Sequence, residues 1–396
     1  MENILKLNAV SHLVDDVLGK NYIVCDNAEN PVAILVRSFD MHDYALPESV
    51  LAVARAGAGV NNIPFEDYAK KGVVVFNTPG ANSNAVNELV ITALLLSSRN
   101  VISAVNWVQT LKGTENISKQ VEKGKKNFVG KELSGKKLGI IGLGAIGAKV
   151  ANTAVSLGME VLGYDPYLSV YHALHLSRHV EVTNNIDDIY KTCDYITIHV
   201  PFTEQNKHMI NASKIEKMKD DVVIINCARG ELVDNSAIID ALNSNKIAKY
   251  VTDFPCEELI GVDNVLCIPH LGASTLEAED NCAIMASKEL KDYIENGNIS
   301  NSVNMPNCSA PRSSNVRIAI IHKNQQNMIA QFTTILAEKG INIDNFQNSS
   351  RGDMAYSIID IPEIDENSLK AFNEIDGIIK IRKIISIFFI TITPKN

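Results

Sequence analysis

The glycine-rich run GLGAIG at 142–147 constrains the fold more than any other feature, because it follows an apolar segment and precedes an expected helix. In a strand–turn–helix unit, the first glycine makes the tight turn, the second admits a pyrophosphate and the third lets helix and strand pack. Asp165 comes eighteen residues after Gly147, at the end of the next expected strand. A carboxylate there accepts hydrogen bonds from an adenosine ribose and repels a 2′-phosphate. The sequence therefore predicts a dinucleotide site that favours NAD over NADP.

Short apolar segments rich in β-branched residues alternate with helical patterns along most of the chain. Strands are expected at 33–36, 51–56 and 73–76, and then at 138–141, 161–164, 195–200, 222–226, 250–254 and 265–268. Apolar residues at helical spacing predict a helix over 84–96. Strands that alternate with helices form parallel sheets covered on both faces. We therefore expect an α/β protein with a doubly wound parallel sheet.

The C-terminal part has a different pattern. Between 297 and 315, 13 of 19 residues are Gly, Asn, Ser or Pro, which is typical of a linker. Beyond it we expect strand 316–321, helix 325–339, strands near 341–346 and 354–361, helix 366–375 and a strand from about 379. This βαββαβ order predicts a ferredoxin-like module. The apolar tail 384–393 is interpreted as a last strand or interface, with an aggregation-prone end as the alternative.

Composition excludes several classes of protein. With 37 Lys and Arg against 46 Asp and Glu, the net charge is −9, so nucleic acid is not an expected partner. Seven cysteines without a C-x-x-C pair favour a reducing compartment. We find neither a basic leader followed by an apolar stretch nor an apolar run approaching the roughly 20 residues of a membrane span. The expectation is a cytoplasmic protein without a membrane partner.

Polar residues follow three further strands of the expected sheet, in the segments 226–230, 253–258 and 268–273. Ligands bind at the carboxyl ends of such strands. The segments supply Arg229, the carboxylates of 253–258 and His270. These groups suit oxidation of a hydroxy acid: a cation holds the substrate carboxylate, a base takes the hydroxyl proton and an acid orients that base. Taken singly, each could instead be a surface ion-pair partner or a structural histidine.

Over nearly its whole length the chain resembles the D-2-hydroxyacid dehydrogenases, in particular those with a C-terminal ACT domain. The resemblance rests on RAGAGVNN at 55–62, NTP at 77–79, GLGAIG, YDP at 164–166, NCARG at 226–230 and PHLGAST at 269–275. It implies that Arg229 binds the carboxylate of the 2-hydroxy acid and that His270 accepts the hydroxyl proton. Glu258 would orient His270 and favour its protonated, charged form. The nicotinamide would receive the C2 hydride.

One segment departs from the family pattern. The usual Asp-Val-Phe-x-x-Glu-Pro is replaced by DFPCEEL at 253–259. Counting without gaps from Arg229 selects Glu258 as the acid and keeps Asp253 beside the nicotinamide. Alignment of the Phe-Pro pair selects Glu257 instead.

The resemblance also implies a set of binding residues. The cofactor site would comprise Thr78, Gly142, Gly144, Ala145, Ile146, Gly147, Asp165, Pro201, Cys227, Ala228, Arg229, Asp253, His270, Gly272 and Ala273. The substrate and its phosphate would contact Arg37, Ser38, Arg55, Gly57, Arg229 and His270. The alternative for Arg37 and Arg55 is that they are only surface charges at strand ends.

The C-terminal module resembles an ACT domain whose serine site uses a His-x-Asn turn and a later Asn. His322, Asn324 and Asn342 match that pattern, but Gln325-Gln326-Asn327 replaces the usual Pro-Gly. The alternative is a plain dimerisation module. His172, His175 and His179 would share a helical face, but no Cys or acid is interleaved, so we expect no metal.

These expectations combine into one hypothesis. A flavodoxin-like substrate domain, 1–98 with 276–300, would carry an inserted Rossmann-like NAD domain, 99–275, followed by a linker, 301–315, and an ACT-like domain, 316–396. The reaction would be NAD-dependent oxidation of 3-phospho-D-glycerate to 3-phosphooxypyruvate, the first step of L-serine biosynthesis, in a homodimer or homotetramer with L-serine as effector. The alternatives are a dehydrogenase for an unphosphorylated acid and a non-catalytic NAD-sensing protein.

Overall fold

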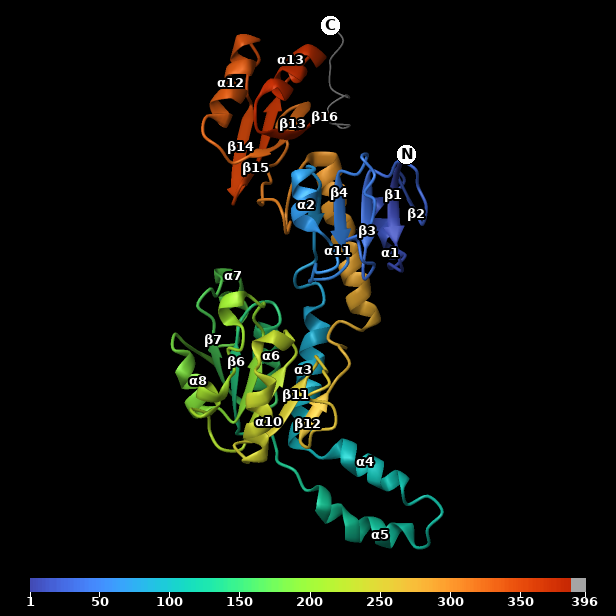
Figure 1. The fold of residues 1–396 in the computed structure, drawn as a ribbon, viewed down its shortest axis with the longest axis vertical. Coiled ribbons are helices and arrows are strands. Elements are labelled where there is room, and N and C mark those ends of the chain that lie inside the picture. The colour runs from blue at the N-terminus through green and yellow to red at the C-terminus, as the bar shows by residue number, and fades with distance from the viewer. Residues whose placement is uncertain (386–396) are drawn as a thin grey trace. The chain divides into compact units, whose positions relative to one another are not determined.

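The computed structural model describes residues 1–385, and its contacts divide the chain into two compact units (Figure 1). The first unit is Met1–Ala81 together with the chain from Glu279, and the second is Asn82–Ala278. Helix α3 (Ser83–Ser98) thus belongs to the second unit, whereas the sequence placed it before a boundary at 98. The reason is packing, because Val90 and Leu94 of α3 are buried against Leu138 of the second unit's sheet.

The first unit contains a five-stranded parallel sheet in the order β2-β1-β3-β4-β5. Its strands are β1 (Glu2–Leu7), β2 (Tyr22–Cys25), β3 (Ala33–Val36), β4 (Ala52–Arg55) and β5 (Val74–Phe76). Helices α1 (Leu13–Leu18) and α2 (Phe65–Lys70) connect them, and α11 (Leu276–Asn296) packs against the sheet. The strand order confirms the flavodoxin-like expectation.

The second unit contains a seven-stranded parallel sheet in the order β12-β11-β10-β9-β6-β7-β8. The strands are β6 (Lys137–Ile141), β7 (Glu160–Tyr164), β8 (Val180–Thr183), β9 (Tyr195–Ile198), β10 (Val222–Asn226), β11 (Ile247–Thr252) and β12 (Val265–Cys267). The helices are α3, α6 (Gly147–Ser156), α7 (Val170–His175), α8 (Ile186–Thr192), α9 (Ala212–Ile215) and α10 (Asn235–Asn243). The strand order reverses between β6 and β9, so the carboxyl ends of these strands form a switch point where ligands bind. The doubly wound, Rossmann-like expectation is confirmed.

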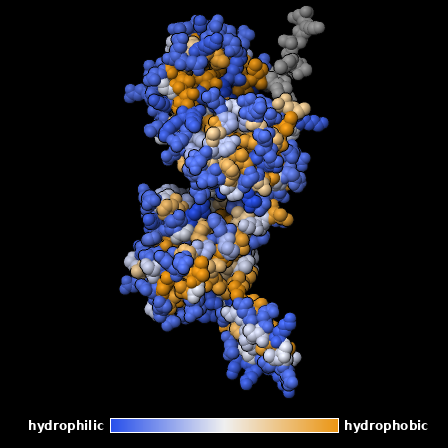
Figure 2. Space-filling model, turned by 45° about the vertical axis from the view of Figure 1, so that its right-hand side comes forward, coloured by the Kyte–Doolittle hydropathy of each residue, from blue (hydrophilic) through white to orange (hydrophobic). Residues whose placement is uncertain are grey.

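Helices α4 (Val101–Gln109) and α5 (Ile117–Gly124) form a hairpin away from the sheet of the second unit (Figure 1). Helix α4 exposes the apolar side chains of Val101, Ile102, Val105 and Val108. Much of the visible surface in Figure 2 is hydrophilic, with apolar patches between. Within residues 1–385, no single helix meets the length and hydropathy of a membrane span, although α3 and α4, bent by 69°, meet them as a pair.

The C-terminal module is an antiparallel sheet in the order β14-β15-β13-β16 with two helices. Its elements are β13 (Val316–Lys323), α12 (Met328–Glu338), β14 (Asn345–Arg351), β15 (Met354–Ile361), α13 (Glu366–Ala371) and β16 (Ile378–Ile385). This is the ferredoxin-like βαββαβ arrangement that the sequence predicted. The interpretation of the apolar tail beyond Ile385 lies outside the described residues.

The module shares a hydrophobic core with the rest of the first unit. Ala319, Ile321 and Tyr356 of its sheet pack in the same buried cluster as Phe76 of β5 and Leu290 of α11. The second core of the module, between its sheet and helices, is separate and contains Ile318, Ile320 and Phe332. Both faces of the sheet are therefore covered at β13 and β15, which are buried along most of their length, whereas the polar strand β14 is only partly buried.

A buried ion pair joins two strands of the module, β13 and β15, and its arginine also binds the preceding chain. Arg317 Nε lies 2.6 Å from Asp360 Oδ1, and both side chains are fully buried. The remaining guanidinium groups donate to backbone oxygens of Asn296, Ala310 and Pro311. Burial acts to raise the pKa of Asp360, but the hydrogen bonds from Arg317 and Ser313 and the charge of Arg317 together outweigh it and hold that pKa below its ordinary value.

The connecting segment, residues 297–315, is packed although its composition is typical of a linker. Asn304 Oδ1 accepts from Val75 N, and its Nδ2 donates to the carbonyls of Phe65 and Val73. Met305 and Cys308 are buried in the shared core. The segment therefore satisfies backbone hydrogen-bonding groups at the edge of β5 that no neighbouring strand pairs with. A side-chain amide such as that of Asn304 can do this although the segment is not a strand.

Candidate functional site

The glycine-rich turn has the backbone geometry that a dinucleotide requires. Gly142 has φ +96°, and a Cβ there would lie 2.6 Å from the carbonyl oxygen of His199. A Cβ on Gly147 would lie 1.9 Å from the carbonyl oxygen of Gly142, whereas one on Gly144 would meet nothing within 4 Å. The first and third glycines are thus needed for the turn, and the second leaves open space before the N-terminus of α6. This space fits the pyrophosphate of NAD.

Asp165 lies directly after β7 and binds the same turn. Its Oδ2 accepts from Leu143 N at 2.8 Å, and its Oδ1 accepts from Tyr167 N at 2.9 Å. Each carboxylate oxygen has a second lone pair, so the group can still accept hydrogen bonds from a ribose. The structure places Asp165 and the glycine turn at adjacent strand ends, as the sequence predicted for an NAD site.

The loop after β10 presents Arg229 to solvent. The fully buried Asn226 holds this loop, because its Oδ1 accepts from Ala228 N and its Nδ2 donates to the carbonyl of Arg229. Arg229 Nη1 donates to the carbonyl of Ala228 at 2.6 Å, which leaves the other guanidinium N–H groups for a ligand. Burial raises the pKa of the Cys227 thiol to about 12, so this side chain is a neutral packing group.

Asp253 organises the loop that carries His270. It is buried, and its two carboxylate oxygens accept from Leu271 N and Gly272 N, each at 2.8 Å. Burial raises the pKa of Asp253 above its usual value, although the two backbone hydrogen bonds oppose that effect. His270 adopts φ +55°, and its exposed ring packs 5.0 Å, centroid to centroid, from that of Phe254. Asp253 thus sets the position of the histidine through the backbone.

Glu257 and Glu258 both lie in the turn after β11, and both are exposed. Across residues 1–385 the structure records no hydrogen bond or ion pair between His270 and either carboxylate. The assignment of the acid to Glu258 or Glu257 therefore stays a prediction. Catalytic hydrogen bonds commonly tighten only when the substrate binds, so the arrangement is compatible with either residue.

The other expected cofactor residues fall at four places, three in the second unit and one in the first. Ala145 and Ile146 complete the glycine turn, Pro201 follows β9, and Gly272 and Ala273 follow His270, all in the second unit. Thr78 belongs to the first unit, where its backbone N–H donates to the carbonyl of Gly57.

The expected phosphate residues lie together at the carboxyl ends of β3 and β4 in the first unit. Arg55 Nε donates to the carbonyl of Arg37 at 3.0 Å, and Arg37 Nη2 lies 2.6 Å from Glu279 Oε1. Asn8, with φ +61°, accepts from Arg37 N and donates to Ser38 Oγ. Sequence reasoning did not select Asn8, and the signal that could have shown it is an Asn directly after the first strand, where left-handed backbone is common.

Each of the three expected effector residues makes hydrogen bonds to other groups of the C-terminal module. His322 is buried, and its ring nitrogens contact the carbonyl of Lys323 and the side chains of Asn348 and Ser357. Asn324 Nδ2 donates to the carbonyl of Gly352, and Asn342 Nδ2 to Asp344. Among the described side chains, none of His322, Asn324 and Asn342 is hydrogen-bonded to another of the three.

His172 and His175 lie on α7, and His179 follows that helix. The ring of His175 packs 4.4 Å, centroid to centroid, from that of Tyr171, and its Nδ1 contacts the Tyr171 carbonyl. No group of three His, Cys, Asp or Glu side chains within residues 1–385 is arranged to hold a metal ion.

Comparison with known proteins gives the family. Residues 91–272 match the model of the D-isomer specific 2-hydroxyacid dehydrogenase NAD binding domain. The D-3-phosphoglycerate dehydrogenase of Escherichia coli K12 is 34% identical over 349 residues, which cover 85% of this chain and 82% of that protein. The D-3-phosphoglycerate dehydrogenase of Methanocaldococcus jannaschii is 38% identical over 266 residues, 66% of this chain, but this chain spans only about half, 48%, of that protein's length.

Solved structures agree at the level of the fold. The D-mandelate dehydrogenase of Rhodotorula graminis in its apo form superposes with a TM-score of 0.64 at 22% identity, covering 79% of this chain and 99% of that one. The D-lactate dehydrogenase of Aquifex aeolicus, complexed with NAD and lactic acid, gives 0.58 at 22% identity, with coverage of 77% and 100%. The chain belongs to the D-isomer specific 2-hydroxyacid dehydrogenases and is an NAD-dependent oxidoreductase of that family.

Proposed function

We propose that the chain oxidises 3-phospho-D-glycerate to 3-phosphooxypyruvate, the first step of L-serine biosynthesis. The observation that carries this choice of substrate is the pair Arg37 and Arg55 on adjacent strand ends, joined through the Arg37 carbonyl. Guanidinium groups suit a phosphate, which accepts several charge-assisted hydrogen bonds, and a bound phosphate would compete with Glu279 for Arg37. The names of the E. coli and M. jannaschii relatives support the same substrate.

Each of the proposed catalytic residues has one task. Arg229 binds the substrate carboxylate and so orients C2, while His270 accepts the proton of the C2 hydroxyl on a ring nitrogen. Glu258, or Glu257 in the gapped alignment, stabilises the imidazolium that results. Asp253 keeps the histidine loop in place through its two backbone hydrogen bonds. The bound nicotinamide supplies the hydride acceptor, so the hydroxyl proton and the C2 hydride are both accounted for.

The test is a comparison of substrates by purified protein. NADH oxidation is followed with 3-phosphooxypyruvate, hydroxypyruvate, glyoxylate and pyruvate, with NADPH as cofactor control. We expect the phosphorylated acid to have the highest kcat/KM, and Arg37→Gln to reduce this preference chiefly through KM. A preference for an unphosphorylated acid that Arg37→Gln does not alter would contradict the phosphate assignment. Absence of turnover with every acid would favour an NAD-sensing role.

Regulation, assembly and location form the second part of the proposal. L-Serine is the proposed effector, with His322, Asn324 and Asn342 as its ligands. Because the His322 ring is already bonded inside the module, serine would have to displace these contacts. A homo-oligomer is supported by the exposed apolar side of α4. The free state of all seven cysteines supports a cytoplasmic location.

A further inference from the structure

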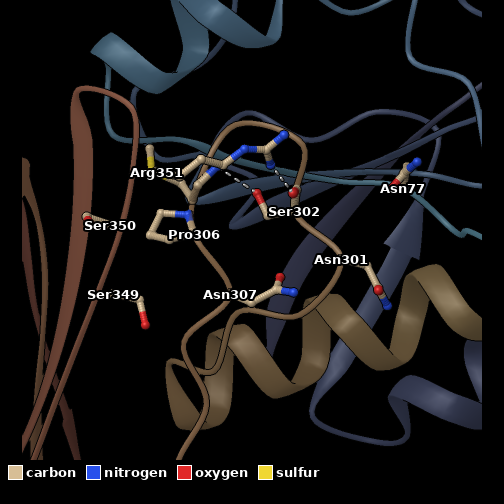
Figure 3. A pocket seen from close by; sticks show the side chains of 9 residues that line it. Asn77, Asn301, Ser302, Pro306, Asn307, Ser349, Ser350 and Arg351 are labelled. Atoms are coloured by element: carbon tan, nitrogen blue, oxygen red, sulfur yellow. Dashed lines mark hydrogen bonds between the residues drawn. The ribbon is translucent and has the colours of Figure 1, made fainter. Parts of the chain in front are cut away.

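The first unit contains a polar pocket of about 510 Å³ that is lined by none of the residues assigned above to catalysis (Figure 3). Three segments that are distant in the sequence line it. Asn77 follows β5, Asn301 and Asn307 belong to the connecting segment, and Ser349–Arg351 end β14. Its volume is in the range of small-molecule sites, which is roughly 300–1,000 Å³.

The lining has one cation and several neutral hydrogen-bonding groups. Arg351 Nη1 donates a hydrogen bond to the carbonyl of Ser302 at 3.0 Å (Figure 3). The other guanidinium N–H groups remain for a ligand. The side chain of Asn307 is exposed and has no hydrogen bond to the part of the chain that the structure describes. Three amides and three serine hydroxyls line the pocket, and no carboxylate does. Asn77 Nδ2, Asn301 Nδ2 and Ser302 Oγ already donate to Ala58, Glu289 and Val75, which leaves the amide oxygens of Asn77 and Asn301 as acceptors for a ligand.

This combination selects a ligand class. The guanidinium binds a carboxylate in a planar, bidentate manner, and a single guanidinium balances a single negative charge. Amides and hydroxyls both donate and accept, as the hydroxyl groups of a sugar require. An amino group would find no carboxylate in the lining to balance its charge.

We propose that this pocket binds a polyhydroxy monocarboxylate, that is, a sugar acid. Such a ligand would join the C-terminal module to the segment that follows β5, because Arg351 and Asn77 lie on these two parts of the unit. Binding would also stabilise the packed connecting segment through Asn301 and Asn307.

The experiment is isothermal titration of the full chain carrying Arg229→Gln, a background that removes the carboxylate ligand proposed for the reaction. D-Gluconate is the probe. Sorbitol lacks its carboxylate and hexanoate lacks its hydroxyl groups, and inorganic phosphate tests for a general anion site. We expect saturable binding of gluconate that is at least tenfold tighter than that of each of the other three probes.

Variants locate the binding. Arg351→Gln should weaken gluconate binding tenfold or more, since a charge-assisted pair is lost. Asn307→Ala should weaken it severalfold without breaking a protein hydrogen bond, which guards against misfolding of the first variant. Lys339→Gln is the control, because it removes one exposed positive charge from the same module outside the pocket. Absence of saturable gluconate binding, equal binding of sorbitol or phosphate, or affinity unchanged by both pocket variants would overturn the proposal.

Discussion

Glu289 on α11 is a buried acid whose titration should make stability fall as the pH rises from 4.5 to about 8. Its side chain is only 9% exposed, its Oε1 accepts from Asn301 Nδ2 at 2.8 Å, and its Oε2 has no hydrogen-bond partner in the part of the chain that the structure describes. Burial raises the pKa of Glu289 from 4.5 to about 8, although the hydrogen bond from Asn301 opposes the shift. Between these two values the folded protein keeps the proton and the unfolded chain loses it.

Rising pH therefore removes stability, because the unfolded state gains an ionised, hydrated carboxylate that the folded state cannot form. The loss approaches about 1.4 kcal/mol for each pH unit within that window, and from pH 5.5 to 7.5 it amounts to about 2–3 kcal/mol. The loss is complete only above the pKa of the folded protein. Glu289→Gln keeps the shape of the protonated acid and the acceptor for Asn301, so it should remove this contribution.

The assay is urea unfolding of the wild type and of Glu289→Gln at pH 5.5, 6.5 and 7.5. The variant should gain about 2–3 kcal/mol relative to the wild type across this range. Glu277→Gln, at an exposed position near the start of the same helix, is the matched control. Its free energy of unfolding should change with pH in the same way as that of the wild type. If the difference between Glu289→Gln and the wild type stayed constant with pH, the argument from burial would be refuted.

Three further predictions concern the cofactor turn, the buried ion pair and the acid. Gly147→Ala should both destabilise the fold and abolish NADH binding, whereas Gly144→Ala should fold normally but bind NADH more weakly. Thermal melting measures the folding, and fluorescence titration measures the NADH binding. Arg317→Gln should destabilise the C-terminal module by about 3–5 kcal/mol in urea, since it leaves a buried carboxylate unpaired. Of Glu257→Gln and Glu258→Gln, the latter should lower kcat far more; the reverse result would select the gapped alignment.

The second unit was largely predictable because its strands are buried on both faces. Segments such as Val222–Asn226 are continuous apolar runs between turn residues, and that pattern is specific to a central parallel strand. The edge strand β8, Val180–Thr183, was not anticipated, since Glu181 and Thr183 make it look like a loop. β1 and β2 were missed for a similar reason, because their polar and apolar residues are mixed.

Residues whose role depends on distant partners could not be read from the sequence. The composition of 297–315 indicates a linker, yet Asn304 completes the edge of β5, which lies more than 200 residues earlier. Glu289 occupies an ordinary helix position, and only the packing of α11 shows that its carboxyl group is buried. The roles of Asp253 and Asn226 as supports of the functional loops likewise follow from hydrogen bonds across the fold.

The most direct test of the account is the ratio of kcat/KM for 3-phosphooxypyruvate to that for hydroxypyruvate, measured with NADH in the wild type and in His270→Asn. The account predicts a large ratio in favour of the phosphorylated acid, and loss of turnover for both acids in the variant with NADH binding retained. A ratio near one in the wild type, or turnover that survives His270→Asn, would contradict it.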